Sequence, residues 1–323
     1  MMGEFLFGVC HPGRAFDAMN EVGINAVRLD VPFPFADRDR KLSDSFKNTA
    51  AWVRDLRERD FRLVGITPYP RAIPDWNGPP ASDGWFELVR DCGRFLAEYF
   101  GDDIPIWQST NEMNVDRFRE PLDINQAMRF VRDGALGIKG AKSSLLVGAN
   151  MGGCSEEAMR LFRELYESEV PWDYVGTDGY FGTWEEGSPQ SWIEKLDELE
   201  KVTPLPVLAM EWGFSSKGGI MTADEKIPVP DPHDLGKWWH GWDDRGVVRE
   251  HMWDNQALYI TEAMDILADR TIGAFYYCWG DSPKCWCDTP DCPVECNWGL
   301  VDMQGNPKPS WYAMQESIRR LSR

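Results

Sequence analysis

Residues 4–31, EFLFGVCHPGRAFDAMNEVGINAVRLDV, alternate between two kinds of segment. Apolar runs at residues 4–10 and 25–31 flank an amphipathic stretch at residues 14–22. Short apolar runs predict buried strands, and the amphipathic stretch between them predicts a helix. The runs are mostly apolar, as is typical of parallel strands that are covered by helices. The stretch therefore predicts a β-α-β unit.

The same alternation continues through the chain and predicts eight strand–helix units. The strands are expected at residues 4–10, 25–31, 61–67, 104–109, 145–149, 172–177, 205–210 and 271–278. The helices are expected at residues 14–22, 45–59, 84–100, 124–138, 156–167, 191–201, 256–269 and 310–321. Eight such units are the signature of a (β/α)8 TIM barrel. We therefore predict an α/β fold in which residues 1–323 form a single (β/α)8 catalytic domain.

A doubly wound open sheet is the competing fold. Its usual phosphate-binding turn has the pattern G-x-G-x-x-G directly after the first strand. Here the first strand is followed by Val9-Cys10-His11-Pro12-Gly13, which lacks that pattern, so the barrel is favoured. In a barrel the chemistry takes place on the loops that follow the strands. The longest of these loops are expected after strand seven, at residues 214–255, and after strand eight.

The composition excludes several classes of protein. With 53 acidic and 34 basic residues, the formal charge of −19 disfavours nucleic acid and anionic membranes as partners. The longest apolar stretch, residues 272–279, is far shorter than the roughly 20 residues that span a bilayer. The N-terminal residues MMGEFLF do not have the pattern of a signal peptide. The location is left open: secreted or periplasmic if a signal peptide was removed, and otherwise cytoplasmic.

Aromatic residues make up 13% of the chain, and 16 tryptophans exceed what a core of this size usually needs. An acidic, tryptophan-rich chain of this kind indicates an enzyme that acts on a neutral, flat substrate such as a sugar. The four histidines show no H-E-x-x-H motif, and no G-x-S-x-G motif occurs. A zinc hydrolase and an α/β-hydrolase are therefore disfavoured.

Two glutamates lie at the ends of predicted strands. WQSTNE at residues 107–112 ends the fourth strand with Glu112, and LAMEWG at residues 208–213 ends the seventh with Glu211. Ninety-nine residues separate them, which is three strand–helix units, so they are expected to face each other across the barrel mouth. Glycoside hydrolysis requires two such carboxyl groups, one protonated and one ionised. The alternative is that each glutamate pairs with a nearby arginine, but both positions together favour catalysis.

On these motifs the chain resembles the retaining glycoside hydrolases of clan A, which are barrels with the acid/base on strand four and the nucleophile on strand seven. The resemblance covers residues 4–321 and includes the strand-four pair Asn111-Glu112. It implies that Glu112 is the acid/base and Glu211 the nucleophile of a two-step covalent mechanism. The two carboxyl groups would then lie about 5 to 5.5 Å apart. It also implies a β-linked oligosaccharide or polysaccharide as substrate, and neither a cofactor nor a catalytic metal.

The resemblance implies further substrate-binding residues. Asn111 would bind the sugar 2-hydroxyl, Arg28 and Tyr180 would keep Glu211 ionised, and Trp279 would form the floor of the −1 subsite. The tryptophan-rich loops add two candidate sugar platforms, although core packing is an alternative for any aromatic residue. The full predicted set is Asn111, Arg28, Tyr180, Trp279, Trp242 and Trp286.

The chain departs from the clan pattern where specificity is decided. Met113 follows the Asn-Glu pair where proline is common, and residues 67–70 lack the histidine that many relatives have there. No family within the clan is therefore assigned, and the sugar configuration and endo or exo action stay open. A non-catalytic carbohydrate-binding barrel and a transglycosylase with the same glutamates are the alternatives.

Four cysteines gather in the loop after strand eight, in the pattern C-x-C-x4-C-x3-C: Cys285, Cys287, Cys292 and Cys296. This is not one of the common zinc-finger spacings. Disulfides, a structural metal site and free thiols all stay open. In each case we expect the cluster to shape the rim of the active site without a chemical role. The other cysteines, Cys10, Cys92, Cys154 and Cys278, are scattered and are expected to be small buried residues.

Overall fold

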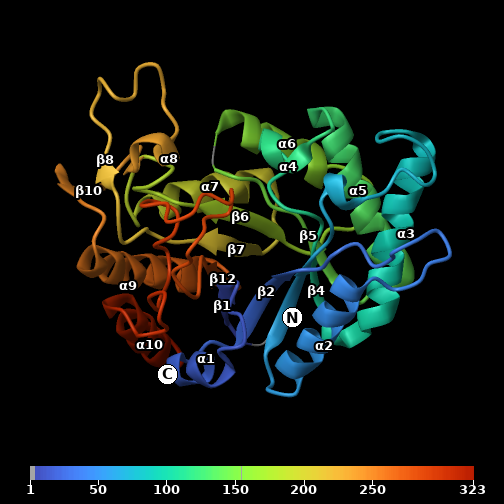
Figure 1. Cartoon of the computed structure of the whole chain (residues 1–323), viewed down its shortest axis with the longest axis horizontal. Coiled ribbons are helices and arrows are strands. Elements are labelled where there is room, and N and C mark those ends of the chain that lie inside the picture. Colours follow the sequence, from blue (N-terminus) through green and yellow to red (C-terminus); the bar gives the residue numbers. More distant parts are fainter. Residues whose placement is uncertain (1–3, 154) are drawn as a thin grey trace. The chain divides into compact units, whose positions relative to one another are not determined.

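A computed structural model describes residues 4–153 and 155–323, so residues 1–3 and Cys154 lie outside it. All eight predicted strands are present (Figure 1). They are β1 (Leu6–Cys10), β2 (Ala26–Asp30), β3 (Arg62–Ile66), β4 (Ile106–Gln108), β5 (Leu146–Gly148), β6 (Val175–Gly179), β7 (Val207–Trp212) and β12 (Gly273–Tyr276). Their order in the sheet is β5-β4-β3-β2-β1-β12-β7-β6, which follows the order of the chain. This order confirms the predicted fold class, a (β/α)8 barrel.

The eight predicted helices are also present. They are α1 (Phe16–Val22), α2 (Asp44–Arg57), α3 (Asp83–Phe100), α5 (Ile124–Ala141), α6 (Glu156–Tyr166), α7 (Ser191–Val202), α9 (Trp253–Arg270) and α10 (Pro309–Leu321). Ser43, Ser82, Asp123 and Ser155 cap the N-termini of α2, α3, α5 and α6. Each side chain accepts a hydrogen bond from a backbone N–H that the helix leaves without an internal partner. Along the described residues, no helix has both the length and the apolar character needed to cross a membrane.

The chain divides into two compact units. One contains the chain up to Asn25, Gly179–Asp197 and Ala209–Arg323, and the other contains Ala26–Asp178 and Glu198–Leu208. We call them the first and the second unit. A single catalytic domain over residues 1–323 stays a prediction.

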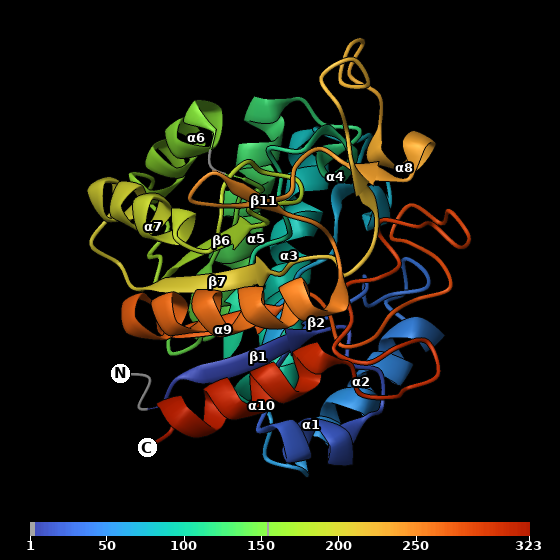
Figure 2. The same ribbon diagram turned by 90° about the vertical axis from the view of Figure 1, so that its left-hand side faces the viewer.

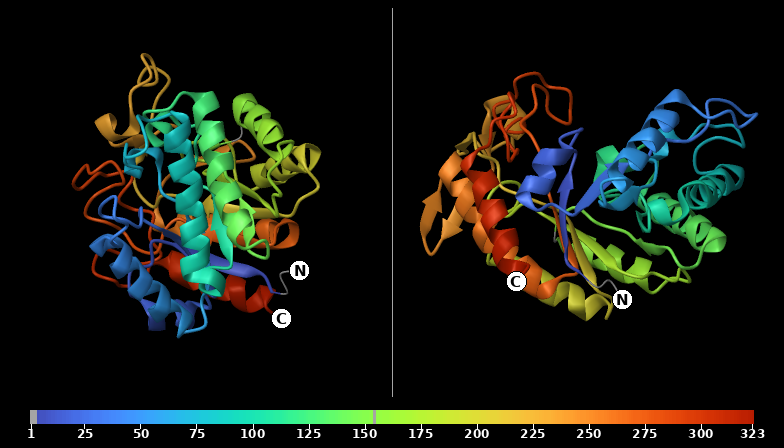
Figure 3. Two further views of the ribbon diagram at one scale, coloured as in Figure 1. Left: turned by 90° about the vertical axis from the view of Figure 1, so that its right-hand side faces the viewer. Right: turned by 90° about the horizontal axis from the view of Figure 1, so that it is seen from below.

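In the second unit, β2, β3, β4 and β5 pair in parallel, with Val27 opposite Leu63 and Trp107 opposite Val147. Helices α3 and α5 lie side by side (Figure 3, left). Glycine makes this close approach possible, because a Cβ on Gly137 would lie only 2.1 Å from the carbonyl oxygen of Arg90. Short elements in the connections are η1 (Pro70–Ala72), η2 (Gly101–Asp103) and α4 (Asp116–Arg119).

In the first unit, β1 pairs with β12 and β12 pairs with β7. Helices α9 and α10 lie side by side (Figure 2). The long loop after β7 is more structured than expected, because it contains two small sheets and a short helix. These elements are β8 (Gly219–Ile220), α8 (Pro232–Leu235), β9 (Lys237–Trp238), β10 (Trp242–Asp244) and β11 (Val247–Arg249).

A buried ion pair holds the loops of the first unit to α10. Lys308, whose side chain is 0% exposed, precedes α10 and donates to Asp281 Oδ1 at 3.0 Å and to Ser216 Oγ at 2.8 Å. Asp281 also accepts from the backbone N–H of Gly299 at 2.8 Å. Burial raises the pKa of Asp281 and lowers the pKa of Lys308, and their mutual attraction opposes both shifts. Lys308 thus links the loop after β7, through Ser216, to the loop after β12, through Asp281.

Replacement of this cation should destabilise the protein. Lys308→Met leaves the carboxylate of Asp281 buried without its partner, which costs about 3–5 kcal/mol in comparable cases. Urea unfolding followed by circular dichroism measures the loss. Lys47→Met, which removes an exposed pair with Asp44 on α2, is the matched control and should change stability little. Equal, small effects of both changes would show that the buried pair does not stabilise the fold.

Candidate functional site

Polar side chains converge in the second unit where strands β2 and β4 end and β5 is followed by its loop. The side-chain oxygen Oδ1 of Asn111 accepts hydrogen bonds from Arg28 Nη2 at 2.6 Å, Gln108 Nε2 at 2.9 Å and Asn150 Nδ2 at 2.7 Å. Asn111 is only 4% exposed. Because three donors meet at one end of its amide, the orientation of Asn111 is set, and its Nδ2 presents N–H donors at the other end.

A strained turn directs Glu112. Thr110 and Glu112 have positive φ angles of 55° and 45°, a region that residues other than glycine occupy at an energetic cost. The backbone N–H of Thr110 donates to Thr67 Oγ1 at 2.8 Å, and that of Glu112 donates to Asn150 Oδ1 at 3.1 Å. These hydrogen bonds hold the turn. Strain of this kind often occurs where a fold positions a functional side chain.

The carboxyl group of Glu112 packs against the loop after β5. A Cβ on Gly152 would lie 2.6 Å from Glu112 Oε1, so only glycine leaves room for the carboxyl group there. Asn114 holds this glycine in place at two points. Its Nδ2 donates to the Gly152 carbonyl at 2.8 Å, and its Oδ1 accepts from the Gly152 N–H at 2.9 Å. The position of Glu112 thus depends on the Asn114–Gly152 pair.

Gly152→Ala should displace the Glu112 carboxyl group and leave the fold intact. The clash is with the end of a flexible side chain, so we expect a small change in melting temperature and a fall of at least about tenfold in kcat/KM on any substrate that needs this group. Steady-state kinetics and thermal unfolding give the two readouts. Gly140→Ala, which meets open space on α5, is the matched control. Unchanged kinetics in Gly152→Ala would mean that Glu112 does not act from this position.

Glu211 lies in the first unit, one residue before the end of β7, and is 8% exposed. The hydroxyl of Tyr180 donates to its Oε2 at 2.5 Å. Edge-to-face contacts with Trp298 at 5.0 Å and Tyr277 at 6.0 Å hold the ring of Tyr180. The hydrogen bond that we expected between Tyr180 and Glu211 is therefore present.

A pocket of about 460 Å³ lies within the first unit, at the ends of β1 and β12. This volume is in the usual range for small-molecule sites. The pocket is lined by residues 11–13, 277–286, 295, 296 and 298, which include Trp279 and Trp286. Trp279 is 6% exposed, and its ring contacts Trp311 edge to face, whereas Trp286 is 43% exposed. Both tryptophans that we predicted around this loop thus line one pocket.

Glu295 also lines this pocket, and no sequence motif singled it out. The carboxyl group is 5% exposed and accepts a hydrogen bond from Trp298 Nε1 at 2.8 Å. Burial raises the pKa of Glu295 to about 7, although hydrogen bonds from Trp298, Trp286 and Trp184 act in the opposite direction. Near neutral pH the pocket therefore contains a carboxyl group that can hold its proton.

The raised pKa of Glu295 makes stability depend on pH. Between about pH 4.5 and pH 7 the folded chain keeps a proton that the unfolded chain releases, so the free energy of unfolding should fall as pH rises. Glu295→Gln has no proton to lose, and it should flatten this slope and become more stable than the native chain above pH 7, by up to about 3 kcal/mol. Urea unfolding between about pH 5 and pH 8 tests this. Glu87→Gln, at an exposed position, should keep the native slope.

Trp242 does not have the role that we predicted for it. The side chain is 1% exposed and contacts Tyr259 and Phe214 edge to face. The guanidinium group of Arg249 lies 4.9 Å from its ring centroid. Protein therefore surrounds the ring, and no face is available to a sugar. The prediction of Trp242 as a sugar platform is not supported.

Sequence reasoning missed the amides that orient Asn111. Gln108 ends β4 and donates to Asn150 Oδ1 at 2.7 Å, and Asn150 in turn donates to Asp178 Oδ2 in β6. Gln108 could have been selected from the sequence, because it is a polar residue at the end of an apolar strand, and barrels place functional groups at such positions. Arg28 donates to Gln108 and Asn111 in the second unit. A contact between Arg28 and Glu211 stays a prediction, as does the separation of Glu112 and Glu211.

Comparison with solved structures places the fold among (β/α)8-barrel glycoside hydrolases. A thermostable mutant of the xylanase Xyn10A from Cellvibrio japonicus superposes with a TM-score of 0.71 at 15% identity, over 98% of both chains. A family 39 glycoside hydrolase from Bacteroides cellulosilyticus WH2 gives a TM-score of 0.67 at 16% identity, over 98% of this chain and 64% of that one. The expected resemblance to this class of barrels is confirmed at the level of the fold.

A sequence relative points in the same direction. The chain is 24% identical to a beta-xylosidase from Caldicellulosiruptor saccharolyticus over 337 aligned positions, which cover 92% of this chain and 62% of the relative. The chain thus spans less than two thirds of the length of that curated protein. No protein-family profile matches the chain.

Proposed function

We propose that the chain is a retaining β-glycoside hydrolase that cleaves β-linked glycans or oligosaccharides and has Glu112 and Glu211 as its catalytic residues. The observation that carries the proposal is that each glutamate lies at the carboxyl end of a barrel strand, Glu211 within β7 and Glu112 in the turn after β4, and has its own polar support. Glu211 accepts a hydrogen bond from the hydroxyl of Tyr180. Glu112 lies in a turn whose backbone N–H groups donate hydrogen bonds to Asn150 and Thr67. The name of the sequence relative, a beta-xylosidase, makes β-xylosides the first substrates to test.

The two carboxyl groups would divide the chemistry. The hydroxyl of Tyr180 donates to Oε2 of Glu211 and so orients the carboxyl group that would act as the nucleophile. In the first step Glu211 attacks the anomeric carbon while Glu112 gives its proton to the departing oxygen, so a glycosyl ester forms as the glycosidic bond breaks. In the second step Glu112 takes a proton from water, and that water displaces Glu211. Two displacements at the same carbon leave its configuration unchanged.

Asn111 would bind the 2-hydroxyl of the sugar. Its Oδ1 is engaged by three donors, so its Nδ2 is the end that donates to the substrate. Hydrogen bonds to the 2-hydroxyl strengthen in the transition state and contribute several kcal/mol to the rate. The buried network around Asn111 would thus set the direction of this donor in advance.

The pocket of the first unit would hold a sugar unit. Trp279 and Trp286 offer aromatic surface to the C–H faces of a pyranose, and a volume of about 460 Å³ accommodates small sugar units. Because the pKa of Glu295 is about 7, its carboxyl group can donate a hydrogen bond to a sugar hydroxyl when protonated and accept one when ionised. We assign Trp279 to the floor of the −1 subsite and Trp286 to the rim.

Alanine variants separate the two roles. Glu211→Ala should lose about 10⁴-fold or more of kcat/KM on every β-xyloside, because no other group forms the ester. Glu112→Ala should lose as much on xylobiose but should form the ester readily from a dinitrophenyl xyloside, whose leaving group needs no proton. Stopped-flow release of dinitrophenol and steady-state kinetics measure both. Glu87→Ala is the surface control.

Three outcomes would contradict the proposal. Proton NMR of the first product should show the β-anomer, and an initial α-anomer would exclude the covalent step. A chain that binds xylan but turns over no β-xyloside, glucoside, mannoside or galactoside would be a carbohydrate-binding barrel. Equal inactivity of Glu112→Ala on activated and natural substrates would mean that another group is the acid.

A further inference from the structure

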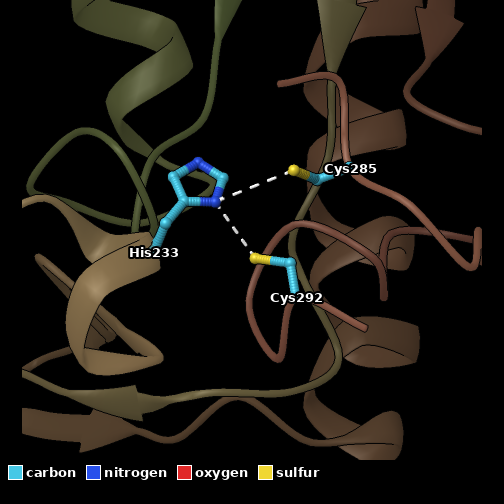
Figure 4. Close-up of side chains that lie close together, drawn as sticks. All are labelled: His233, Cys285 and Cys292. Atoms are coloured by element: carbon cyan, nitrogen blue, oxygen red, sulfur yellow. Dashed lines mark hydrogen bonds between the residues drawn. The ribbon is translucent and has the colours of Figure 1, made fainter. Parts of the chain in front are cut away.

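A histidine joins the cysteine cluster of the first unit. His233 is in α8, in the loop after β7, whereas the cysteines are in the loop after β12. One ring nitrogen, Nδ1, lies 3.0 Å from the sulfur of Cys292 and 3.8 Å from that of Cys285 (Figure 4). The sulfur of Cys287 is 3.6 Å from the same nitrogen. His233, Cys285 and Cys292 have their ligand atoms within 4.8 Å of one another.

Hydrogen bonding does not account for this arrangement. A ring nitrogen carries either one hydrogen or one lone pair, so it can engage one sulfur and not three. A tetrahedral zinc ion does account for it, because bonds of about 2.3 Å to sulfur and about 2.0–2.1 Å to nitrogen place the nitrogen about 3.6 Å from each sulfur. The distances to Cys287 and Cys285 match this value, and the distance to Cys292 is shorter. The sulfurs of Cys285 and Cys287 lie 2.8 Å apart, closer than the roughly 3.8 Å between two thiolates on one zinc, so these two side chains would move apart when the ion binds. A disulfide would use two of the sulfurs and would not explain why the histidine approaches.

We propose that His233, Cys285, Cys287 and Cys292 bind one Zn²⁺ ion, which links the loop after β7 to the loop after β12. Three thiolates and one imidazole form a complete tetrahedral set, as in structural zinc sites that leave no position for a substrate. Soft sulfur ligands favour zinc over magnesium or calcium. The sulfur of Cys287 lies 3.6 and 3.7 Å from the two ring nitrogens, beside the ring, and would supply the fourth ligand after a shift toward the ion.

The surroundings fit a structural site. Cys285 and Cys292 are 6% and 1% exposed and belong to an apolar cluster with Trp238, Val294 and Trp298. Without a cation, thiolates in such a cluster would be costly, so a bound ion would stabilise this group. Asp231 supports the histidine, since its Oδ1 accepts from the His233 backbone N–H at 2.8 Å and lies 3.9 Å from ring Nε2. Carboxylates near the second nitrogen are common around metal-bound histidines.

The site has a consequence for the pocket. Cys285 and Trp286 line the pocket, and the ring of Trp286 lies 6.0 Å from that of His233 in an edge-to-face contact. A metal that fixes Cys285, Cys287 and α8 would also hold Trp286 at the rim. Removal of the ion should therefore lower the stability of the protein and make Trp286 at the pocket rim more mobile. It should not remove either of the two proposed catalytic glutamates.

Metal analysis of the purified full chain tests the proposal. Protein from zinc-supplemented cells, isolated under reducing conditions without chelators, should contain about one zinc per chain by mass spectrometry of the metals. His233→Ala and Cys292→Ser should lower this zinc content at least about fivefold. A chelator should lower the melting temperature of the unmodified chain but should not change that of either variant. Cys296→Ser is the matched control, because Cys296 is buried in the same loop but its sulfur has no contact with His233 among those described, unlike the three proposed thiol ligands, and it should keep the zinc.

Measurements on the unmodified chain keep the test decisive if a variant does not fold. A thiol-specific mercurial should release the zinc as cysteines react, and cobalt in place of zinc should show the visible bands of a tetrahedral thiolate site. A chain that takes up no zinc, that contains an iron–sulfur cluster, or whose loop cysteines are oxidised in pairs would overturn the proposal. Loss of zinc in Cys296→Ser but not in Cys287→Ser would overturn the ligand set. None of these results depends on glycosidase activity.

Discussion

Apolar strands buried on both faces are the constraint on which the rest of this structure depends. The strands β1 and β7 are buried along their whole length, so a polar side chain within them would lack water. Polar groups therefore collect where the strands end. Gln108 is the last residue of β4, and Asn111 and Glu112 follow three and four residues later, in the turn after the strand. The same feature that stabilises the fold thus places the chemistry at the carboxyl ends of the strands.

Groups that are buried at those ends must satisfy one another. Asn111 and Asn150 are 4% and 2% exposed, and each takes part in several hydrogen bonds. Removal of any member would leave a buried polar atom without a partner, so the network is rigid for an energetic reason. This rigidity also makes it possible to keep Thr110 and Glu112 at unfavourable φ angles. The buried hydrogen bonds around Asn111 and Asn150 thus account both for the rigidity of the network and for the strained backbone of the turn.

The loops of the first unit use their aromatic residues differently from one another. Trp238 and Trp242, in the loop after β7, are 0% and 1% exposed and form a small core with neighbouring aromatic rings. Trp286, in the loop after β12, is 43% exposed and lines the pocket. A loop with short strands and no large sheet needs its own core, which accounts for the burial of Trp238 and Trp242. The high tryptophan count reflects this loop packing as well as any sugar binding.

The sequence by itself determined the fold class, the positions of eight strands and eight helices, and the placement of Glu112 and Glu211 at strand ends. These features follow from local periodicity, because the spacing of apolar residues within ten or twenty positions is set by strand and helix geometry. The Tyr180–Glu211 hydrogen bond was also expected, but from the resemblance to the clan A hydrolases and not from local periodicity.

Only the tertiary structure decided that Trp242 is core, that Glu295 has a pKa near 7, and that His233 approaches cysteines 52 to 59 residues away. Each of these depends on the path of a long, irregular loop. No periodic pattern encodes that path. The identity of a tryptophan or a histidine does not show whether its side chain will lie in a core, at a pocket rim or beside a metal. Burial and proximity are products of long-range packing, so they could be read only once the chain was folded.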